Sequence, residues 1–169
     1  VKRTGGIDEP AQLEKLTAMH MAFGRTMDFD GGAYGDLVLS RLPIDHARTV
    51  PLPWTPGNHR EPRAATEISC AVKGIPVVFI STHLDHTGDP SDRLNQAMTL
   101  NDQFGHNHRP TILAGDFNCD PDSVVMHELA KCWTITTADG KPSFPSDKPT
   151  DSIDHVLIRS QEQRKVVST

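Results

Sequence analysis

The chain has 169 residues, enough to bury a sizeable core, and we expect one domain over residues 1–169. A formal net charge of -5 and a pI near 6.0 lower the expectation of tight binding to duplex nucleic acid. No apolar run in the sequence is long enough to span a bilayer, and the three scattered cysteines suggest neither a disulfide framework nor a zinc site.

The first third of the chain predicts a helix, a turn and a strand. Asp8 followed by Pro10 is typical of a helix start. Roughly helical spacing then continues through Leu13, Leu16, Met19 and Phe23. Gly31-Gly32 predicts a turn, and residues 37–39 predict a strand. The proline-rich stretch over residues 50–62 predicts a surface loop.

The rest of the chain predicts strands that alternate with helices. Residues 68–72 and 77–80 form a predicted hairpin that turns at Lys73-Gly74. A helix follows Asp89-Pro90, with Leu94, Ala97, Met98 and Asn101 on one face. Further strands are predicted over residues 111–114, 133–136 and 153–158, with a short helix over 123–131 and a loop over 142–150. This alternation predicts a mixed sheet that is covered by helices and has polar loops at its strand ends.

The run Ile112-Leu113-Ala114-Gly115-Asp116-Phe117-Asn118 is an apolar strand that ends in Gly-Asp-x-Asn. Asp116 can bind a hard cation, or orient and deprotonate a water molecule. Asn118 lies two residues on, so it faces the same way and can donate to a phosphate oxygen without adding negative charge. The alternative for this motif alone is an Asx-type turn after a strand.

His83 lies at the end of another predicted strand, in Ser81-Thr82-His83. An imidazole there can protonate a leaving oxygen or stabilise a developing oxyanion. It needs a carboxylate that fixes its tautomer, and Glu61 is the candidate because it lies just before the neighbouring strand of the hairpin. The alternative is a core histidine and an exposed loop acid.

Two acids lie inside apolar strands. Asp154 is flanked by Ile153 and His155-Val156, and a buried acid is costly unless it is paired or bound to a metal. We therefore expect a functional carboxylate, with a structural ion pair as the alternative. His155 points to the opposite face and is expected to be structural. Asp36 also interrupts an apolar strand, and the sequence alone gives no account of it.

These motifs, in their order along the chain, resemble the endonuclease/exonuclease/phosphatase superfamily, which includes deoxyribonucleases, phosphatases and sphingomyelinases. The motifs are Glu61-Pro62, Ser81-Thr82-His83-Leu84, Gly115-Asp116-Phe117-Asn118 and Ser152-Ile153-Asp154-His155-Val156. The resemblance implies a four-layer α/β sandwich, in which two packed mixed β-sheets are flanked by helices. It also implies hydrolysis of phosphoesters with Mg²⁺ or Mn²⁺. Relatives occur both secreted and in the cytosol, so the location stays open.

The resemblance implies roles for individual residues. His83 would contact the scissile phosphate, supported by Glu61. Asp116 would position or deprotonate the attacking water, or manage the leaving group, and would be a metal ligand. Asn118 would bind a phosphate oxygen, and Asp154 would orient a histidine. Arg63 would help to neutralise the phosphate, with a solvated surface role as the alternative.

Two motifs of the superfamily are absent from the sequence. Its principal metal ligand is a glutamate in a Gln-Glu-Val-type motif before the first helix, and Glu9 and Glu14 are poor substitutes. Its last motif, Ser-Asp-His, supplies the histidine that would pair with Asp154. Both absences fall at the ends, so we expect the central portion of a domain that is truncated at both ends.

Three functions therefore remain open. The first is a metal-dependent phosphodiesterase, nuclease or phosphatase. The second is a non-catalytic module of the same fold that binds phosphorylated ligands. The third is an enzyme completed by strands from another chain, through oligomerisation or strand exchange. The substrate could be a nucleic acid, a small phosphoester or a phospholipid head group, and the acidic balance argues mildly against duplex DNA.

Overall fold

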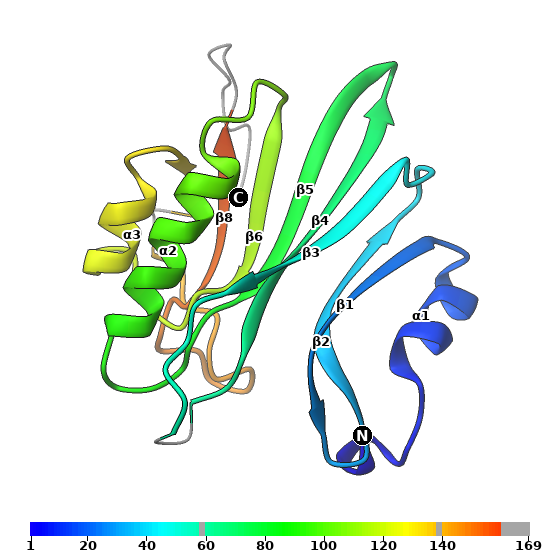
Figure 1. Cartoon of the computed structure of the whole chain (residues 1–169), viewed down its shortest axis with the longest axis horizontal. Helices are drawn as coiled ribbons and strands as arrows, with labels where there is room; N and C mark the ends of the chain where they lie inside the picture. Colours follow the sequence, from blue (N-terminus) through cyan, green and yellow to red (C-terminus); the bar gives the residue numbers. More distant parts are fainter. Residues whose placement is uncertain (58–59, 138–139, 160–169) are drawn as a thin grey trace.

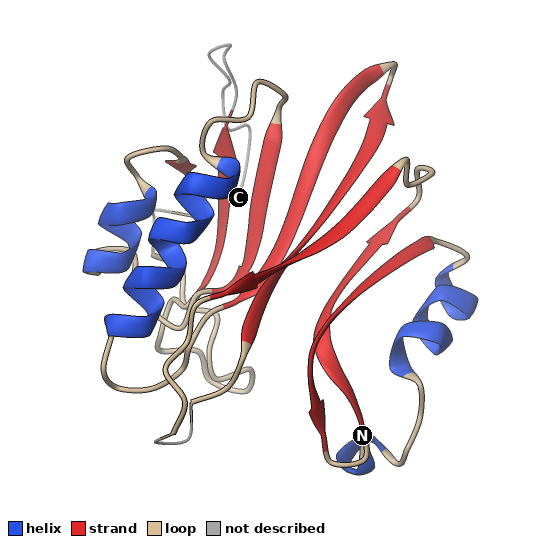
Figure 2. Ribbon diagram, in the orientation of Figure 1, coloured by secondary structure: helices blue, strands red, loops and turns tan. Residues whose placement is uncertain are grey.

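The structure is a computed structural model that describes residues 1–57, 60–137 and 140–159. Two β-sheets pack face to face, and helices lie on their outer sides (Figures 1 and 2). The smaller sheet pairs β1 (His20–Phe29) with β2 (Gly32–Ser40), and α1 (Glu9–Thr17) lies outside it. The larger sheet carries α2 (Ser91–Phe104) and α3 (Val124–Leu129) on its outer face. The expected α/β sandwich is confirmed.

The larger sheet has the strand order β3-β4-β5-β6-β8-β7. Its strands are β3 (His46–Leu52), β4 (Arg63–Val72), β5 (Ile75–His83), β6 (Thr111–Asp116), β7 (Thr134–Ile135) and β8 (Asp154–Arg159). Only the β5–β6 pair is parallel among the described strands, and α2 provides the crossover between them. The sheet is therefore mixed, as the alternation of strands and helices predicts.

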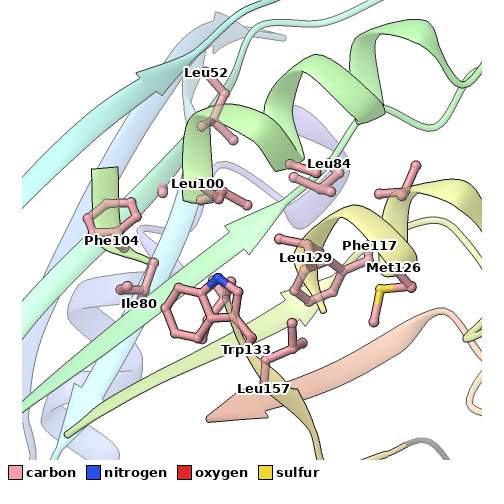
Figure 3. Close-up of a cluster of buried hydrophobic side chains, with 14 of the residues drawn as sticks. Leu52, Ile80, Leu84, Leu100, Phe104, Phe117, Met126, Leu129, Trp133 and Leu157 are labelled. Carbon is pink, nitrogen blue, oxygen red and sulfur yellow. The ribbon is translucent and has the colours of Figure 1, made fainter. Parts of the chain in front are cut away.

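The main core lies between the larger sheet and its two helices. Buried side chains from β5, β6 and β8 meet those of α2 and α3, and Trp133 packs among them (Figure 3). The Trp133 indole donates to Asn101 Oδ1 at 3.0 Å, so its one polar atom is paired inside the core. This packing holds β5, β6 and β8 firmly, and the candidate site lies at their ends.

Three strand ends meet in one row across the larger sheet. His83 on β5 pairs with Asp116 on β6, and Asp116 pairs with Asp154 on β8. Backbone hydrogen bonds continue just past the row. The Leu84 N–H donates to the Asp116 carbonyl at 2.9 Å, and the Phe117 N–H donates to the Ile153 carbonyl at 2.8 Å. Three residues that are distant in the sequence are therefore placed side by side by strand register.

Some predicted elements differ from the structure. The helix that was expected to continue to Phe23 ends at Thr17, because Ala18 takes a left-handed conformation (φ 54°) and the chain then enters β1. Residues 50–52 belong to β3 and not to a loop, and this strand tolerates Pro51 because it is the edge of its sheet. On α2, Met98 is exposed, whereas Ala97 and Asn101, which were expected on the same face, are buried. Among the described residues, none of the helices has the length and apolar character that crossing a bilayer requires.

Gly115 allows β6 to come close to β5. A Cβ built at this position would lie 1.8 Å from the Thr82 carbonyl oxygen, which belongs to the paired backbone. We expect Gly115→Ala to lower the free energy of unfolding by about 3 kcal/mol, at the upper end of the usual cost of overpacking. Gly88→Ala is the control, because a Cβ there meets nothing within 4 Å. Urea unfolding of both variants measures the difference, and equal midpoints would contradict the close approach.

Candidate active site

A cavity of about 180 Å³ opens beside the row of strand ends, between the two sheets. The smaller sheet contributes an apolar and aromatic wall, and the larger sheet contributes a polar wall. The lining residues are Met27, Phe29, Tyr34, Glu61, Arg63, His83 and His86. His83 therefore borders this cavity on one side and faces Asp116 on the other.

The His83 ring is held through both nitrogens. Its Nε2 lies 3.5 Å from Asp116 Oδ2, and its Nδ1 lies 3.2 Å from Arg63 Nη1. A guanidinium only donates, so Nδ1 accepts and the neutral ring carries its hydrogen on Nε2, which faces Asp116. Burial first, and then the Arg63 charge, lowers the pKa of His83 to about 4. His83 is therefore neutral near pH 7.

Arg63 is buried beneath the site, with only 4% of its surface exposed. Its Nη2 lies 3.1 Å from Glu61 Oε2 and 3.1 Å from His86 Nδ1. The surface role that was left open for Arg63 is therefore wrong. Glu61 was expected to contact His83 directly. Among the described residues, Glu61 instead forms an ion pair with Arg63. Its charge still favours a protonated His83 and raises the pKa of that ring, against the larger effects of burial and Arg63.

Asp116 and Asn118 form an Asx-type turn. The Asn118 N–H donates to Asp116 Oδ1 at 2.9 Å, and Asn118 has a left-handed φ of 49°. The Asn118 Nδ2 also donates to the Leu84 carbonyl at 3.0 Å. An Asx-type turn and a role in the active site are thus compatible. The turn holds Oδ1 of Asp116 and leaves Oδ2 facing His83. Burial raises the pKa of Asp116, against the opposing effect of the Asn118 N–H.

Asp154 and His155 lie on opposite faces of β8, as predicted. Asp154 is exposed, so the expectation of a buried acid is wrong; it is the first residue of its strand, where the sheet ends. Its negative charge contributes to the raised pKa of Asp116 across the row. His155 is buried, and its Nε2 lies 2.8 Å from the Cys119 carbonyl, which confirms a structural role.

Sequence reasoning assigned no role to three residues that surround Arg63 and His83. Tyr34 places its hydroxyl 3.5 Å from His83 Nδ1, from the opposite sheet. His86 lies in the loop after β5, and its sequence carries no signal of the contact with Arg63. Asp36 did carry a signal, as an acid in an apolar strand. Burial raises its pKa to about 6, although the Arg63 charge acts in the opposite direction.

Replacing the buried Asp36 carboxyl is expected to raise the free energy of unfolding in a pH-dependent way. A carboxyl whose folded-state pKa exceeds the unfolded value of 3.8 destabilises the folded state progressively as pH rises from 3.8 to about 6, and fully above that. We expect Asp36→Asn to raise the free energy of unfolding at neutral pH by up to ~3 kcal/mol, from about 1.4 kcal/mol per pKa unit. The gain should vanish as pH falls toward 3.8. Urea unfolding across this pH range measures it, with Asp28→Asn on the exposed end of β1 as control.

The described residues offer only part of a metal site. Asp116 and Asp154 place two carboxylates opposite each other in the row, and oxygen ligands of this kind suit Mg²⁺ or Mn²⁺. However, within residues 1–57, 60–137 and 140–159 there is no group of three or more His, Cys, Asp or Glu side chains that could hold a metal ion. These residues therefore do not by themselves enclose a cation.

Comparisons with known structures find the same fold. A mannosyl-6-phosphatase of Bacteroides thetaiotaomicron is 18% identical, with a TM-score of 0.72 over 90% of this chain and 67% of that one. An endonuclease/exonuclease/phosphatase from Beutenbergia cavernae is 25% identical, with a TM-score of 0.71 over 89% of this chain and 50% of that one. The human Nocturnin catalytic domain with bound sulfate is 15% identical, with a TM-score of 0.64 over 90% and 64%.

This chain thus spans between 50% and 67% of the length of these three structures. A comparison with curated proteins finds no match. Residues 7–169 match the Endonuclease/Exonuclease/phosphatase family, which is nearly the whole sequence. The family match agrees with the sandwich fold and with the order of the motifs around the site. The chain therefore belongs to the Endonuclease/Exonuclease/phosphatase family.

Proposed function

We propose that the protein hydrolyses phosphoesters by attack of water on phosphorus, at the row formed by His83, Asp116 and Asp154. The observation that carries this proposal is the contact between a neutral imidazole and a partly buried carboxylate, 3.5 Å apart, beside a buried guanidinium. Phosphoryl transfer needs groups that position water and neutralise charge. Family membership and a phosphatase among the structural neighbours support the general activity.

In the proposed reaction Asp116 orients the attacking water and takes its proton. Burial raises the pKa of Asp116, which makes its carboxylate a stronger base than an exposed one. His83 donates its Nε2 hydrogen to a phosphoryl oxygen, where negative charge develops. Arg63 supplies positive charge behind His83, and Asn118 retains a second Nδ2 hydrogen that can reach a phosphate oxygen. Glu61 holds Arg63 in place.

We also propose that hydrolysis depends on Mg²⁺ or Mn²⁺, with Asp116 among the ligands. This part rests on the family, and the steps assigned above to the residues do not pass through the cation. The small cavity and the acidic net charge favour a small phosphoester over duplex nucleic acid or a phospholipid head group. Nucleic acid that is bound weakly stays the second candidate, because the family that the sequence matches is named for endonucleases and exonucleases as well as phosphatases.

Hydrolysis of p-nitrophenyl phosphate and of bis(p-nitrophenyl) phosphate tests the proposal. We expect turnover with added Mg²⁺ or Mn²⁺, loss of turnover with EDTA, and recovery when the cation is restored. His83→Ala should remove the activity. Phosphate binding without turnover under all these conditions would favour a non-catalytic phospholigand module. Turnover only at concentrations where the chain oligomerises would favour a site that is completed by another copy.

A further inference from the structure

We propose that His86 is a second oxyanion-binding residue at the mouth of the cavity, and that Arg63 is the positioning residue for both His83 and His86. The oxyanion would be a phosphate oxygen of the substrate, and this identification rests on the proposed function. His86 lines the same cavity as His83, and its side chain is exposed.

One guanidinium sets the tautomers of two imidazoles. Arg63 Nη1 lies 3.2 Å from His83 Nδ1, and Arg63 Nη2 lies 3.1 Å from His86 Nδ1. Arginine keeps its protons and cannot accept a hydrogen bond, so both Nδ1 atoms must accept. Each neutral ring therefore carries its hydrogen on Nε2. His86, which lines the cavity, thus keeps an N–H donor at Nε2.

The Nε2 of His86 has no partner among the described residues. His155, in contrast, has contacts at both nitrogens, with the Cys119 carbonyl and the Thr137 hydroxyl. A histidine that only supports the fold is expected to be paired in this way. The arrangement around His86 fixes one nitrogen and leaves the other available, which is the arrangement that a binding residue needs.

The loop that carries His86 is held by hydrogen bonds from α2 although it lies at the surface. The buried Arg93 donates from Nη1 to the carbonyls of Asp85 and Thr87, at 2.9 and 2.6 Å, on either side of His86. The Asp85 N–H donates to Gln96 Oε1 at 2.9 Å, and Gln96 belongs to α2. These bonds hold the backbone on both sides of His86, so its imidazole is preorganised before a ligand arrives.

The donors at this place fit an oxyanion. Arg63, whose charge is shared with Glu61, and His86, with its Nε2 hydrogen, both line the cavity, and a phosphate monoester offers several oxygens to such donors. Met27 and Phe29 form the apolar wall opposite and would contact the organic part of the ester. We therefore infer that the cavity receives the ester beside His83, with the organic part against the smaller sheet.

Two measurements test the proposal on the whole chain. First, long-range ¹H–¹⁵N spectra of histidine-labelled protein report tautomers directly, and we expect Nε2–H for both His83 and His86. Second, inorganic phosphate is titrated near neutral pH and is expected to shift the His86 Nε2 signal. His86→Leu should weaken phosphate binding about tenfold, since hydrogen bonds to charged groups are among the stronger ones. His86→Gln, which keeps an N–H donor, should weaken it less.

His127→Gln is the control, because His127 is exposed on α3, away from the cavity, and phosphate affinity should not change. An Nδ1–H tautomer at His86, or equal phosphate affinity in His86→Leu and wild type, would overturn the proposal. In turnover, His86→Leu should raise KM more than it lowers kcat. If phosphate binds at His86 but no ester is hydrolysed, the proposed function fails and the binding role of His86 stands.

Discussion

Asp116→Asn is expected to lower kcat for phosphoester hydrolysis by about 10²- to 10⁴-fold, the usual contribution of a positioned general base. The asparagine keeps the size of the side chain, and its carbonyl oxygen can still accept from the Asn118 N–H. It cannot take a proton from water at neutral pH. Initial rates at saturating substrate and cation measure the change.

Asp120→Asn is the matched control for this prediction. Asp120 is an exposed carboxylate four residues beyond Asp116, and its side chain does not line the cavity. Equal rates for the two variants would show that the carboxylate of Asp116 does not take part.

Arg63→Met is expected to have the largest effect on stability around the site. Methionine fills much of the same space under the cavity with an apolar side chain. It removes the partner of Glu61 and of the His83 and His86 imidazoles. We expect the free energy of unfolding to fall by about 2–4 kcal/mol, because hydrogen bonds to a buried charge are lost and Glu61 remains only partly exposed. Urea unfolding near neutral pH measures the loss.

The same variant should change the titration of His83. The Arg63 charge is the second cause of the low pKa of His83, so Arg63→Met should raise that pKa from about 4. A histidine with a lowered pKa stabilises the fold fully above its unfolded pKa of 6.5, and this stability is lost as pH falls toward 4. The loss should become smaller in Arg63→Met. NMR titration of the His83 ring gives the two pKa values.

Arg25→Met is the control for these effects. Arg25 pairs with Asp28 at the surface, and both side chains are largely exposed. Such a pair contributes about 0–1 kcal/mol, so the variant should unfold nearly as the wild type does. An Arg63→Met protein that matches Arg25→Met in stability and in the pKa of His83 would contradict the buried position of Arg63.

The sequence was enough to predict the row of strand ends. Apolar runs identified β5, β6 and β8. His83 and Asp116 close β5 and β6, and Asp154 opens the antiparallel β8, so that strand pairing places all three at the same edge. The sequence therefore identifies the residues of the row, and the register shows that they are neighbours. Asp154 was correctly placed on its strand, but its exposure depends on where the sheet ends, which local pattern does not reveal.

The surroundings of the row depend on contacts between the two sheets, and the sequence could not reveal them. Arg63 follows a proline in a polar stretch, and its burial comes from packing against the smaller sheet. That burial explains why Arg63, and not Glu61, contacts Nδ1 of His83. Asp36 was noticed in the sequence, but its place near Arg63 required the arrangement of β2 over β4. The sequence around His86 has no local pattern that would indicate its contact with Arg63.

Hydrolysis in ¹⁸O-labelled water tests the central claim most directly. The protein, with Mg²⁺ or Mn²⁺, is incubated with p-nitrophenyl phosphate, and the released phosphate is examined by ³¹P NMR. Attack of water on phosphorus predicts one ¹⁸O atom in the phosphate product, no label in the alcohol, and no label in either product with Asp116→Asn over the same time. Absence of any labelled phosphate in the wild-type reaction would contradict the account.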